Sequence, residues 1–131
     1  MKADLTDLEK VTQRINEYFE GIHNADAEKL RNVFDPNAHL QAPSLRLTLD
    51  EWLQRVVNRA VPSATNQRFD YRIISIDLSG EQAMAKVECP LLGNFYIDFL
   101  SLLKEDSRWR IVNKMYAHAP LDYQPILITG E

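Results

Sequence analysis

Asp98 is the residue whose chemistry is hardest to explain as ordinary surface or core. It lies within an apolar run, FYIDFL at residues 95–100, where a carboxylate facing solvent would be out of place. If Asp98 faces the interior, burial disfavours its charged form, and a neutral carboxylic acid can donate a hydrogen bond to a ligand oxygen. The alternative is a carboxylate that pairs with a lysine or arginine of a neighbouring strand, or with the backbone. Both interpretations are open from the sequence.

Three further residues could share a binding site with Asp98. Tyr18 lies on the apolar stripe of an expected helix, so its ring should be buried and its hydroxyl needs a partner, from the protein, water or a ligand. Tyr96 alternates onto the same strand face as Asp98. Asn113 alternates with apolar residues, so its amide should be paired, with a ligand or with a backbone group. We expect Tyr18, Tyr96, Asp98 and Asn113 to line one cavity.

Other reactive side chains form no recognisable motif. His39 alternates with two apolar neighbours and should point outward, yet it is the histidine that we keep as a candidate catalytic base. The three histidines lie far apart in sequence, so we expect no metal site and no cofactor. Cys89 is the one cysteine in the sequence, so an intrachain disulfide is excluded. Its apolar neighbours predict a small buried apolar residue at this position. Phosphate-binding loops, nucleophile elbows and zinc-protease motifs are missing from the sequence.

Length and composition indicate the broad class of protein. The 131 residues suit a single domain, and a net charge of -4 argues against a nucleic-acid partner. The first residues lack the apolar core of a signal peptide, and no stretch reaches the roughly 18 apolar residues of a membrane span. We therefore expect a cytoplasmic protein with no membrane partner.

The first half of the chain has the periodicity of helices. Apolar residues recur at spacings of three and four from Leu5 to Ile22, and Asp4 or Thr6 can cap this stripe. A short second helix should follow Asp26 and end at a turn formed by residues 35–37. Thr48, with a glutamate three residues later, forms a capping box that should open a third helix.

The second half alternates with a period of two. The pattern predicts four strands, at residues 68–78, 82–88, 94–104 and 108–117. A short segment in the first half, residues 38–42, also alternates and is predicted to be a strand. Short turns join the last four, so these strands should be antiparallel neighbours. Helices followed by such a meander form an α+β fold, and a tail of residues 118–131 comes after it.

The strand at residues 94–104 is apolar on both faces. Phe95, Ile97 and Phe99 lie on one face, while Tyr96 and Leu100 lie on the other. Helices can cover only one of these faces. The simplest cover for the outer face is a second copy of the chain, so we expect a homodimer.

Four segments carry a family resemblance. YFEGIHNADAEKL (18–30) and VFDPNAHL (33–40) resemble the NTF2-like superfamily, which includes ketosteroid isomerases and SnoaL-like polyketide cyclases. FYIDFLSLLK (95–104) and WRIVNK (109–114) are more similar to the branch labelled "putative lumazine-binding". The resemblance covers about residues 5–117. It implies a single cone-shaped domain, with three N-terminal helices on a strongly curved antiparallel sheet.

The resemblance also implies roles for particular residues. Ketosteroid isomerases use a tyrosine on the first helix and a protonated aspartate on a later strand as an oxyanion hole, and Tyr18 and Asp98 match those positions. Their catalytic base is an aspartate just before a proline, whereas Ala42 precedes Pro43 here. Without that base, steroid isomerisation is disfavoured.

Three functions are consistent with this pattern. The first is binding of a small hydrophobic or aromatic molecule in an apolar pocket with a few hydrogen-bond donors. The second is an isomerase, cyclase or dehydratase that uses Asp98 and Tyr18 as acid or oxyanion donors, with His39 or water as base. The third is an assembly module in which the outer sheet face matters more than the pocket. We favour the first, because the expected base is missing.

Overall fold

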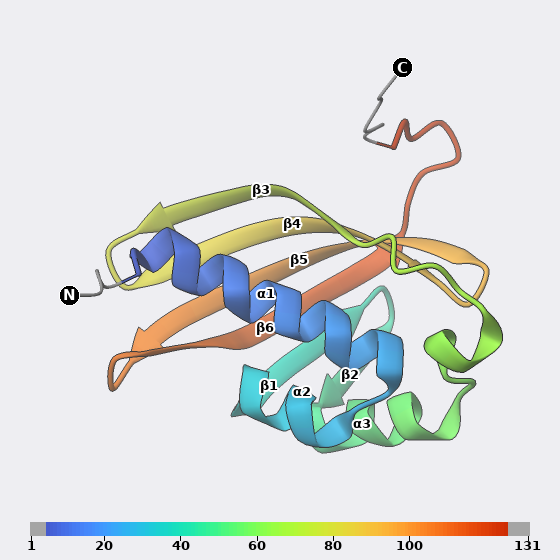
Figure 1. Cartoon of the computed structure of the whole chain (residues 1–131), viewed down its shortest axis with the longest axis horizontal. Helices are drawn as coiled ribbons and strands as arrows, with labels where there is room; N and C mark the ends of the chain where they lie inside the picture. Colours follow the sequence, from blue (N-terminus) through green and yellow to red (C-terminus); the bar gives the residue numbers. More distant parts are fainter. Residues whose placement is uncertain (1–4, 126–131) are drawn as a thin grey trace.

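The computed structural model describes residues 5–125, which form three α-helices and one six-stranded sheet. The helices are α1 (Asp7–Asn24), α2 (Ala27–Val33) and α3 (Leu49–Asn58), and a 3-10 turn η1 (Pro62–Thr65) follows α3. The strands are β1 (Phe34–Ala42), β2 (Leu45–Thr48), β3 (Arg72–Ser79), β4 (Gln82–Leu91), β5 (Asn94–Glu105) and β6 (Arg108–His118). This arrangement confirms the predicted α+β cone (Figure 1).

Capping boxes define where two of the helices begin. In α1 the Thr6 hydroxyl accepts a hydrogen bond from the Glu9 backbone N–H at 3.1 Å, and the Glu9 carboxylate accepts one from the Thr6 N–H. Thr48 and Glu51 make the same reciprocal pair at the start of α3, as the sequence predicted. These side chains satisfy N–H groups that the first turn of a helix leaves without partners.

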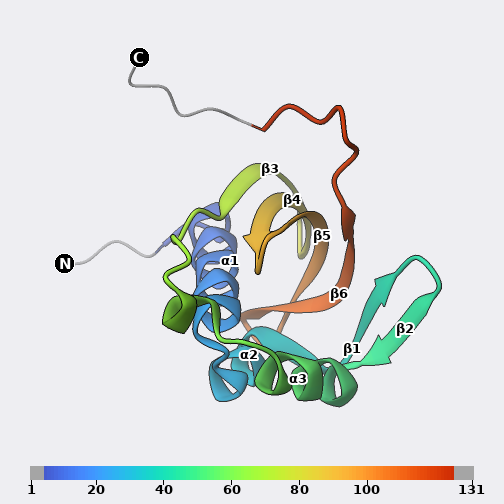
Figure 2. The ribbon, with the colours of Figure 1, turned by 90° about the vertical axis from the view of Figure 1, so that its right-hand side faces the viewer.

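The sheet is mixed and has two open edges. Its strand order is β2-β1-β6-β5-β4-β3, and β1 pairs with β6 in parallel while the other neighbours are antiparallel. The expectation of a wholly antiparallel sheet is therefore wrong at this one junction. The hairpin strand β2 was also not predicted; it follows a tight turn in which Ser44 has a φ of 63°. Figure 2 shows the β1–β2 hairpin projecting beyond the curved sheet.

Register irregularities occur in β1 and β6, and the one in β6 changes which residues face the helices. In β1, residues 35–38 lie between two segments that pair with β6, and the sequence predicted a turn at residues 35–37 that ends α2. In β6, Ile111 pairs with Leu102 and Asn113 pairs with Ser101, so Val112 is the extra residue of a bulge. Side chains after Val112 therefore lie on the opposite face from the one that simple alternation predicts.

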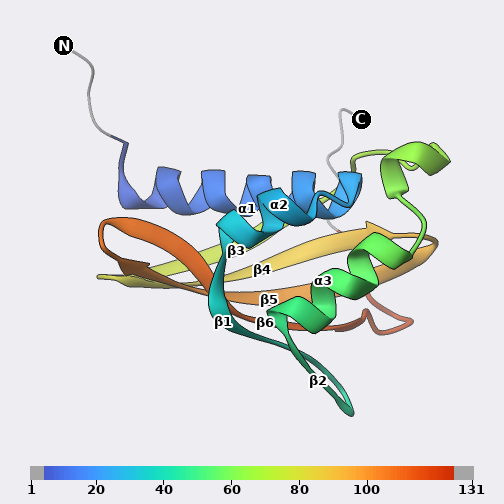
Figure 3. The same ribbon diagram turned by 90° about the horizontal axis from the view of Figure 1, so that it is seen from below.

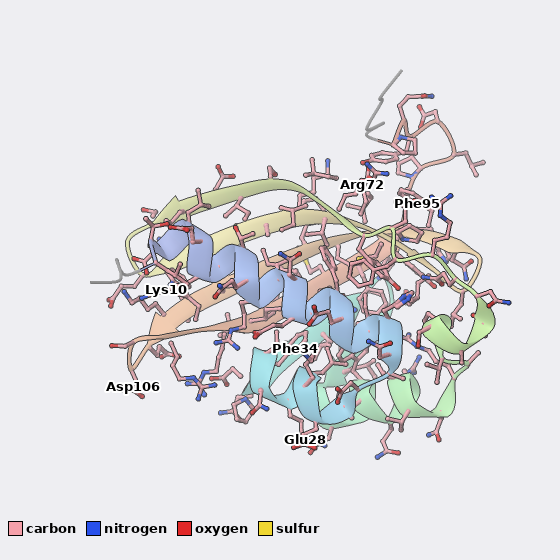
Figure 4. The ribbon with its side chains drawn as sticks, viewed as in Figure 1. Lys10, Glu28, Phe34, Arg72, Phe95 and Asp106 are labelled. Carbon is pink, nitrogen blue, oxygen red and sulfur yellow. The ribbon has the colours of Figure 1, made fainter. Side chains whose placement is uncertain are left out.

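The helices cover one face of the sheet and bury the core against it. Figure 3 shows α1 running along this face, and Figure 4 shows Phe34 beneath α1 at the centre of the molecule. Phe34, Tyr18, Trp52 and Trp109 are all buried. Helix α2 approaches α1 closely at Gly21, where a Cβ atom would lie 2.5 Å from the Cδ2 atom of Leu30. In residues 5–125, no helix is long and apolar enough to cross a membrane.

Candidate functional site

A hydrogen bond between Tyr18 and Asp98 forms the centre of the candidate site. The Tyr18 hydroxyl, from α1, donates to the Oδ2 atom of Asp98, from β5, at 2.6 Å. Both side chains are buried, and they are 80 positions apart in the sequence. Burial, followed by the charge of the neighbouring carboxylate, raises the pKa of Tyr18 well above its ordinary value. Tyr18 is therefore a neutral donor, and Asp98 is the acceptor in this contact.

The Tyr18–Asp98 pair lies in a cavity of about 40 Å³. The lining side chains are Tyr18, Ile22, Trp52, Arg59, Cys89, Leu91, Tyr96, Asp98, Lys114 and Tyr116. One water molecule needs about 10–15 Å³ by this kind of measure, whereas pockets that enclose a whole drug-sized ligand have roughly 300–1,000 Å³. The cavity thus has room for the head group of a ligand. A larger body would have to extend past the partly exposed rings of Tyr96 and Tyr116.

Lys114 brings a buried ammonium group to this cavity. Its side chain is only 6% exposed, and its Nζ atom lies 4.2 Å from the ring centre of Trp52, 4.5 Å from that of Tyr116 and 5.3 Å from that of Tyr18. In the part of the chain that the structure describes, this Nζ has no hydrogen-bond or ion-pair partner. Burial lowers the pKa of Lys114, while Asp98 opposes that effect.

Arg59 supplies a second cation from the residue that follows α3. Its Nε atom is buried and has no hydrogen-bond partner among residues 5–125. Burial lowers the pKa of Arg59, but an arginine keeps its charge at physiological pH. A buried N–H without an acceptor is costly, so this group is available to a ligand oxygen.

Cys89 lies beside the same carboxylate without being a reactive thiol. Burial raises the pKa of Cys89 well above its ordinary value, and the charge of Asp98 and a hydrogen bond to it add to this effect. A thiol must ionise to become a strong nucleophile, so the site keeps Cys89 inert. This agrees with its prediction as a small buried apolar residue.

The structure brings three of the four predicted ligand-binding residues together. Tyr18, Tyr96 and Asp98 line the cavity, but Asn113 does not. The predicted placement of Asn113 is wrong because the bulge at Val112 turns it to the outer face, where its Oδ1 atom accepts a hydrogen bond from Gln41 at 2.8 Å.

His39 is exposed on β1 and does not line the cavity. The structure therefore offers no support for His39 as the base of a reaction at Asp98. Arg59, Lys114 and Tyr116 line the cavity and were missed. Lys114 and Tyr116 were missed because the bulge at Val112 reverses the face on which they lie. Arg59 was missed because it lies in a connecting segment whose sequence has no regular period.

A second, larger hollow lies on the outer face of the sheet, and we call it the outer groove. Its volume is about 560 Å³, and its lining includes Ile97, Phe99, Met115, Pro120 and Tyr123. Phe99 and Met115 are 40% and 45% exposed. The segment after β6 borders the groove, and Figure 4 shows Phe95 beside this segment.

Comparison with known proteins identifies the family. A family model described as "Putative lumazine-binding" matches residues 6–117, which is most of the chain. The chain belongs to this family. A search of curated proteins found no match.

Solved structures show that this family shares the NTF2-like fold. An NTF2-like protein of unknown function from Shewanella baltica is 23% identical, with a TM-score of 0.76 over 89% of this chain and 99% of that one. Another from Silicibacter pomeroyi is 24% identical, with a TM-score of 0.72 over 86% and 95% of the two chains. A third, from Methylobacillus flagellatus, is 22% identical, with a TM-score of 0.73 over 91% and 97%. At these identities the likeness establishes the fold alone.

The described residues include no group that resembles a metal centre. No three histidine, cysteine, aspartate or glutamate side chains between residues 5 and 125 gather closely enough to hold an ion. The chemistry that the cavity offers is therefore that of its tyrosines, its carboxylate and its two cations.

Proposed function

We propose that this protein binds a small organic molecule whose anionic head group enters the cavity between Arg59 and Lys114. The observation that carries the proposal is a pair of cationic side chains that line one cavity without an acceptor oxygen: the Arg59 Nε is buried with no hydrogen-bond partner, and the Lys114 Nζ contacts only aromatic rings. A buried polar group without a partner is a cost to the fold, and a ligand oxygen would remove that cost.

Charge and shape favour a carboxylate on an aromatic or apolar body. Two cations face the cavity against the single carboxylate of Asp98, so one positive charge is left for a ligand to neutralise. The volume of about 40 Å³ suits a head group, and the rings of Tyr96 and Tyr116 offer flat surfaces for a planar body. This refines the predicted small hydrophobic or aromatic ligand by adding its charge.

Catalysis by Asp98 and Tyr18 is the second candidate, and it has weaker support. The Tyr18 hydroxyl hydrogen is directed at Asp98, so it is not free to polarise a substrate carbonyl. Ala42 lines the outer groove and offers no carboxylate, and His39 lies away from the cavity. An isomerase, cyclase or dehydratase would then depend on water as its base.

The outer groove supports a homodimer as part of the same proposal. Phe99 and Met115 would be shielded from water if a second copy covered this face, which a monomer leaves exposed. A cytoplasmic location, and the absence of nucleic-acid and membrane partners, stay predictions from composition.

The test is a titration with benzoate, using benzamide as the neutral control of the same shape. The chain has two tryptophans, and their indole N–H signals report on different places by NMR. Trp52 lines the cavity, whereas Trp109 donates to Asp7 at 3.0 Å at a distant end of α1. Benzoate should shift the Trp52 signal in a saturable way, and it should leave Trp109 in place.

Two variants make this test specific. Arg59→Gln should weaken benzoate binding at least about tenfold, the loss expected for a charge-assisted hydrogen bond. Arg31→Gln removes a surface cation that pairs with Asp50 and should leave binding unchanged. Equal shifts by benzamide and benzoate, or a benzoate affinity that Arg59→Gln leaves intact, would contradict the proposal.

A further inference from the structure

Lys114 has surroundings that differ from those of an ordinary charged lysine. Its Nζ contacts the faces of three aromatic rings and has no protein acceptor for its hydrogens in the described residues. Two other lysines of the described chain have carboxylate partners: Lys29 pairs with Glu20 at 3.0 Å, and Lys104 pairs with Asp7 at 3.1 Å. Lys114 is instead enclosed by ring faces, with the open space of the cavity beside it.

This environment favours the neutral amine more than a surface position does. Burial lowers the pKa of Lys114, and the charge of Arg59 acts in the same direction. Asp98 opposes both, but no ion pair within 4.0 Å joins it to Lys114. The ammonium form of Lys114 contributes the positive charge of the cavity, and loss of one proton from it gives a neutral lysine, which is a nucleophile toward carbonyl carbons. Desolvation near another cation is a recognised way to favour that neutral form.

We propose that Lys114 forms a reversible imine with a small oxo acid, meaning a carbonyl compound that carries a carboxylate. The inference rests on the proposed function, because Arg59 would hold the carboxylate of the same ligand. The cavity then presents three complementary groups to one molecule: a cation for the carboxylate, an amine for the carbonyl carbon, and Asp98 for the protons.

The reaction balances without any co-reactant. The Nζ lone pair attacks the carbonyl carbon, and the C=O π electrons move to the oxygen. Asp98 accepts a proton from the nitrogen through one bridging water and passes it to that oxygen, which gives a carbinolamine. A second proton moves in the same way as the C–O bond breaks, so one water leaves and a C=N bond remains. Its reverse is hydrolysis by one water.

The flat walls of the cavity suit the product as well as the amine. An imine and its attached carbons are planar, and a protonated imine is a cation. The ring faces of Trp52 and Tyr116, which lie 4.2 and 4.5 Å from Nζ, can contact such a group as they contact the ammonium. The bond can therefore form without a new set of protein contacts.

Reductive trapping with glyoxylate tests the proposal. Glyoxylate is an aldehyde with a carboxylate, and sodium cyanoborohydride converts its imine into a stable carboxymethyl-lysine that peptide mass spectrometry locates. At neutral pH we expect Lys114 to be modified at least about tenfold faster than Lys10, because the cavity would hold the aldehyde beside the Lys114 amine. Lys10 is the internal control, since it is more exposed than Lys114 and lies outside both the cavity and the outer groove. Modification of Lys10 at an equal or higher rate would overturn the proposal.

Variants separate the imine from simple binding. Lys114→Arg keeps the cation but cannot form an imine, so modification at this position should vanish while the Trp52 indole still responds to benzoate. Asp98→Asn should slow trapping at Lys114 and leave the rate at Lys10 unaffected; an unchanged rate at Lys114 would remove Asp98 from the mechanism. If benzoate binds but glyoxylate fails to modify Lys114, this inference fails and the binding proposal stands. If neither occurs, both fail.

Discussion

The inner cavity and the outer groove lie on opposite faces of the same two strands, and they differ in almost every physical property. The cavity is about 40 Å³ and brings together a carboxylate, two cations and three tyrosine rings. The groove is about 560 Å³, and its best-exposed contacts are apolar. Asp98 and Phe99 are consecutive in β5, yet one belongs to the cavity and the other to the groove.

This contrast shows that the volume of a hollow and the charged groups that line it indicate different ligand sites in this molecule. Volume alone would select the groove as the ligand site, because it falls in the range of known ligand pockets. The cationic groups of Arg59 and Lys114, which have no acceptor oxygen in the described residues, indicate the cavity instead. We assign the groove to self-association and the cavity to a ligand, and Tyr116, which borders both, lies where the two regions meet.

The largest expected effect is loss of the dimer when charge is placed in the groove. Phe99→Glu would bury an unpaired carboxylate at the centre of an interface, which should raise the dimer dissociation constant by at least about 100-fold. Sedimentation at micromolar concentration should show wild type near twice 15.2 kDa and the variant at 15.2 kDa. Met84→Glu is the control, because Met84 is exposed on β4 outside the groove and should leave the dimer intact. A monomeric wild type would end the assignment of the groove to self-association.

The next effect compares two short hydrogen bonds, one on each side of the sheet. Tyr18→Phe removes the 2.6 Å bond to buried Asp98 and should lower the free energy of unfolding by about 1–3 kcal/mol in urea titrations. Tyr123→Phe removes an equally short bond, to Glu88, from a partly exposed segment. Glu88 is as buried as Asp98, but Tyr123 is partly exposed, so water entering beside its ring can replace the lost donor and the second loss should be smaller. Equal losses would mean that the cavity is as accessible to water as the outer face.

The smallest effect concerns the cost of the buried cation. Lys114→Met should stabilise the protein by about 1 kcal/mol at neutral pH, because it removes a charge with no close counter-ion. The pKa of Lys114 is lowered below its ordinary 10.5, so the unfolded chain binds more protons than the native state just below that value, and wild-type stability rises with pH there. The advantage of the variant should therefore shrink as the pH approaches 10.5.

The control for that measurement is Lys10→Met on α1. Lys10 is partly exposed and lies outside both the cavity and the outer groove, so its replacement should change the urea midpoint little at any pH. A destabilised Lys114→Met would show that the ammonium stabilises the fold through its aromatic contacts, which would weaken the case for a reactive amine.

Local patterns were enough to predict most of the fold. The capping box at Thr48, the apolar stripe of α1 and the alternation of β4, β5 and β6 depend on neighbours a few residues apart. The two-sided apolar character of β5 also predicted a second copy of the chain over its outer face, which stays a prediction. What alternation could not predict was the parallel pairing of β1 with β6, since that depends on the path of the whole chain.

The candidate site was predicted in part for the same reason. Tyr18, Tyr96 and Asp98 were placed correctly because each follows an unbroken period of its own element. Asn113 was misplaced and Lys114 was missed because one extra residue, Val112, inverts the faces of β6. Arg59 lies where the chain has no regular period, and only the folded structure shows that its Nε is buried.

The strand order has a consequence for how the protein is made. Among residues 5–125, β6 is the last strand to leave the ribosome, yet it lies in the interior of the sheet, between β1 and β5. Until β6 emerges, no strand joins β1 and β2 by hydrogen bonds to β3, β4 and β5. Phe34 also lacks Ile111, the residue that it pairs with on β6. The nascent chain therefore carries an incomplete core through most of its synthesis. Lys114 also joins Tyr18 and Asp98 only at this final step, so the cavity and the complete sheet are formed by the same event.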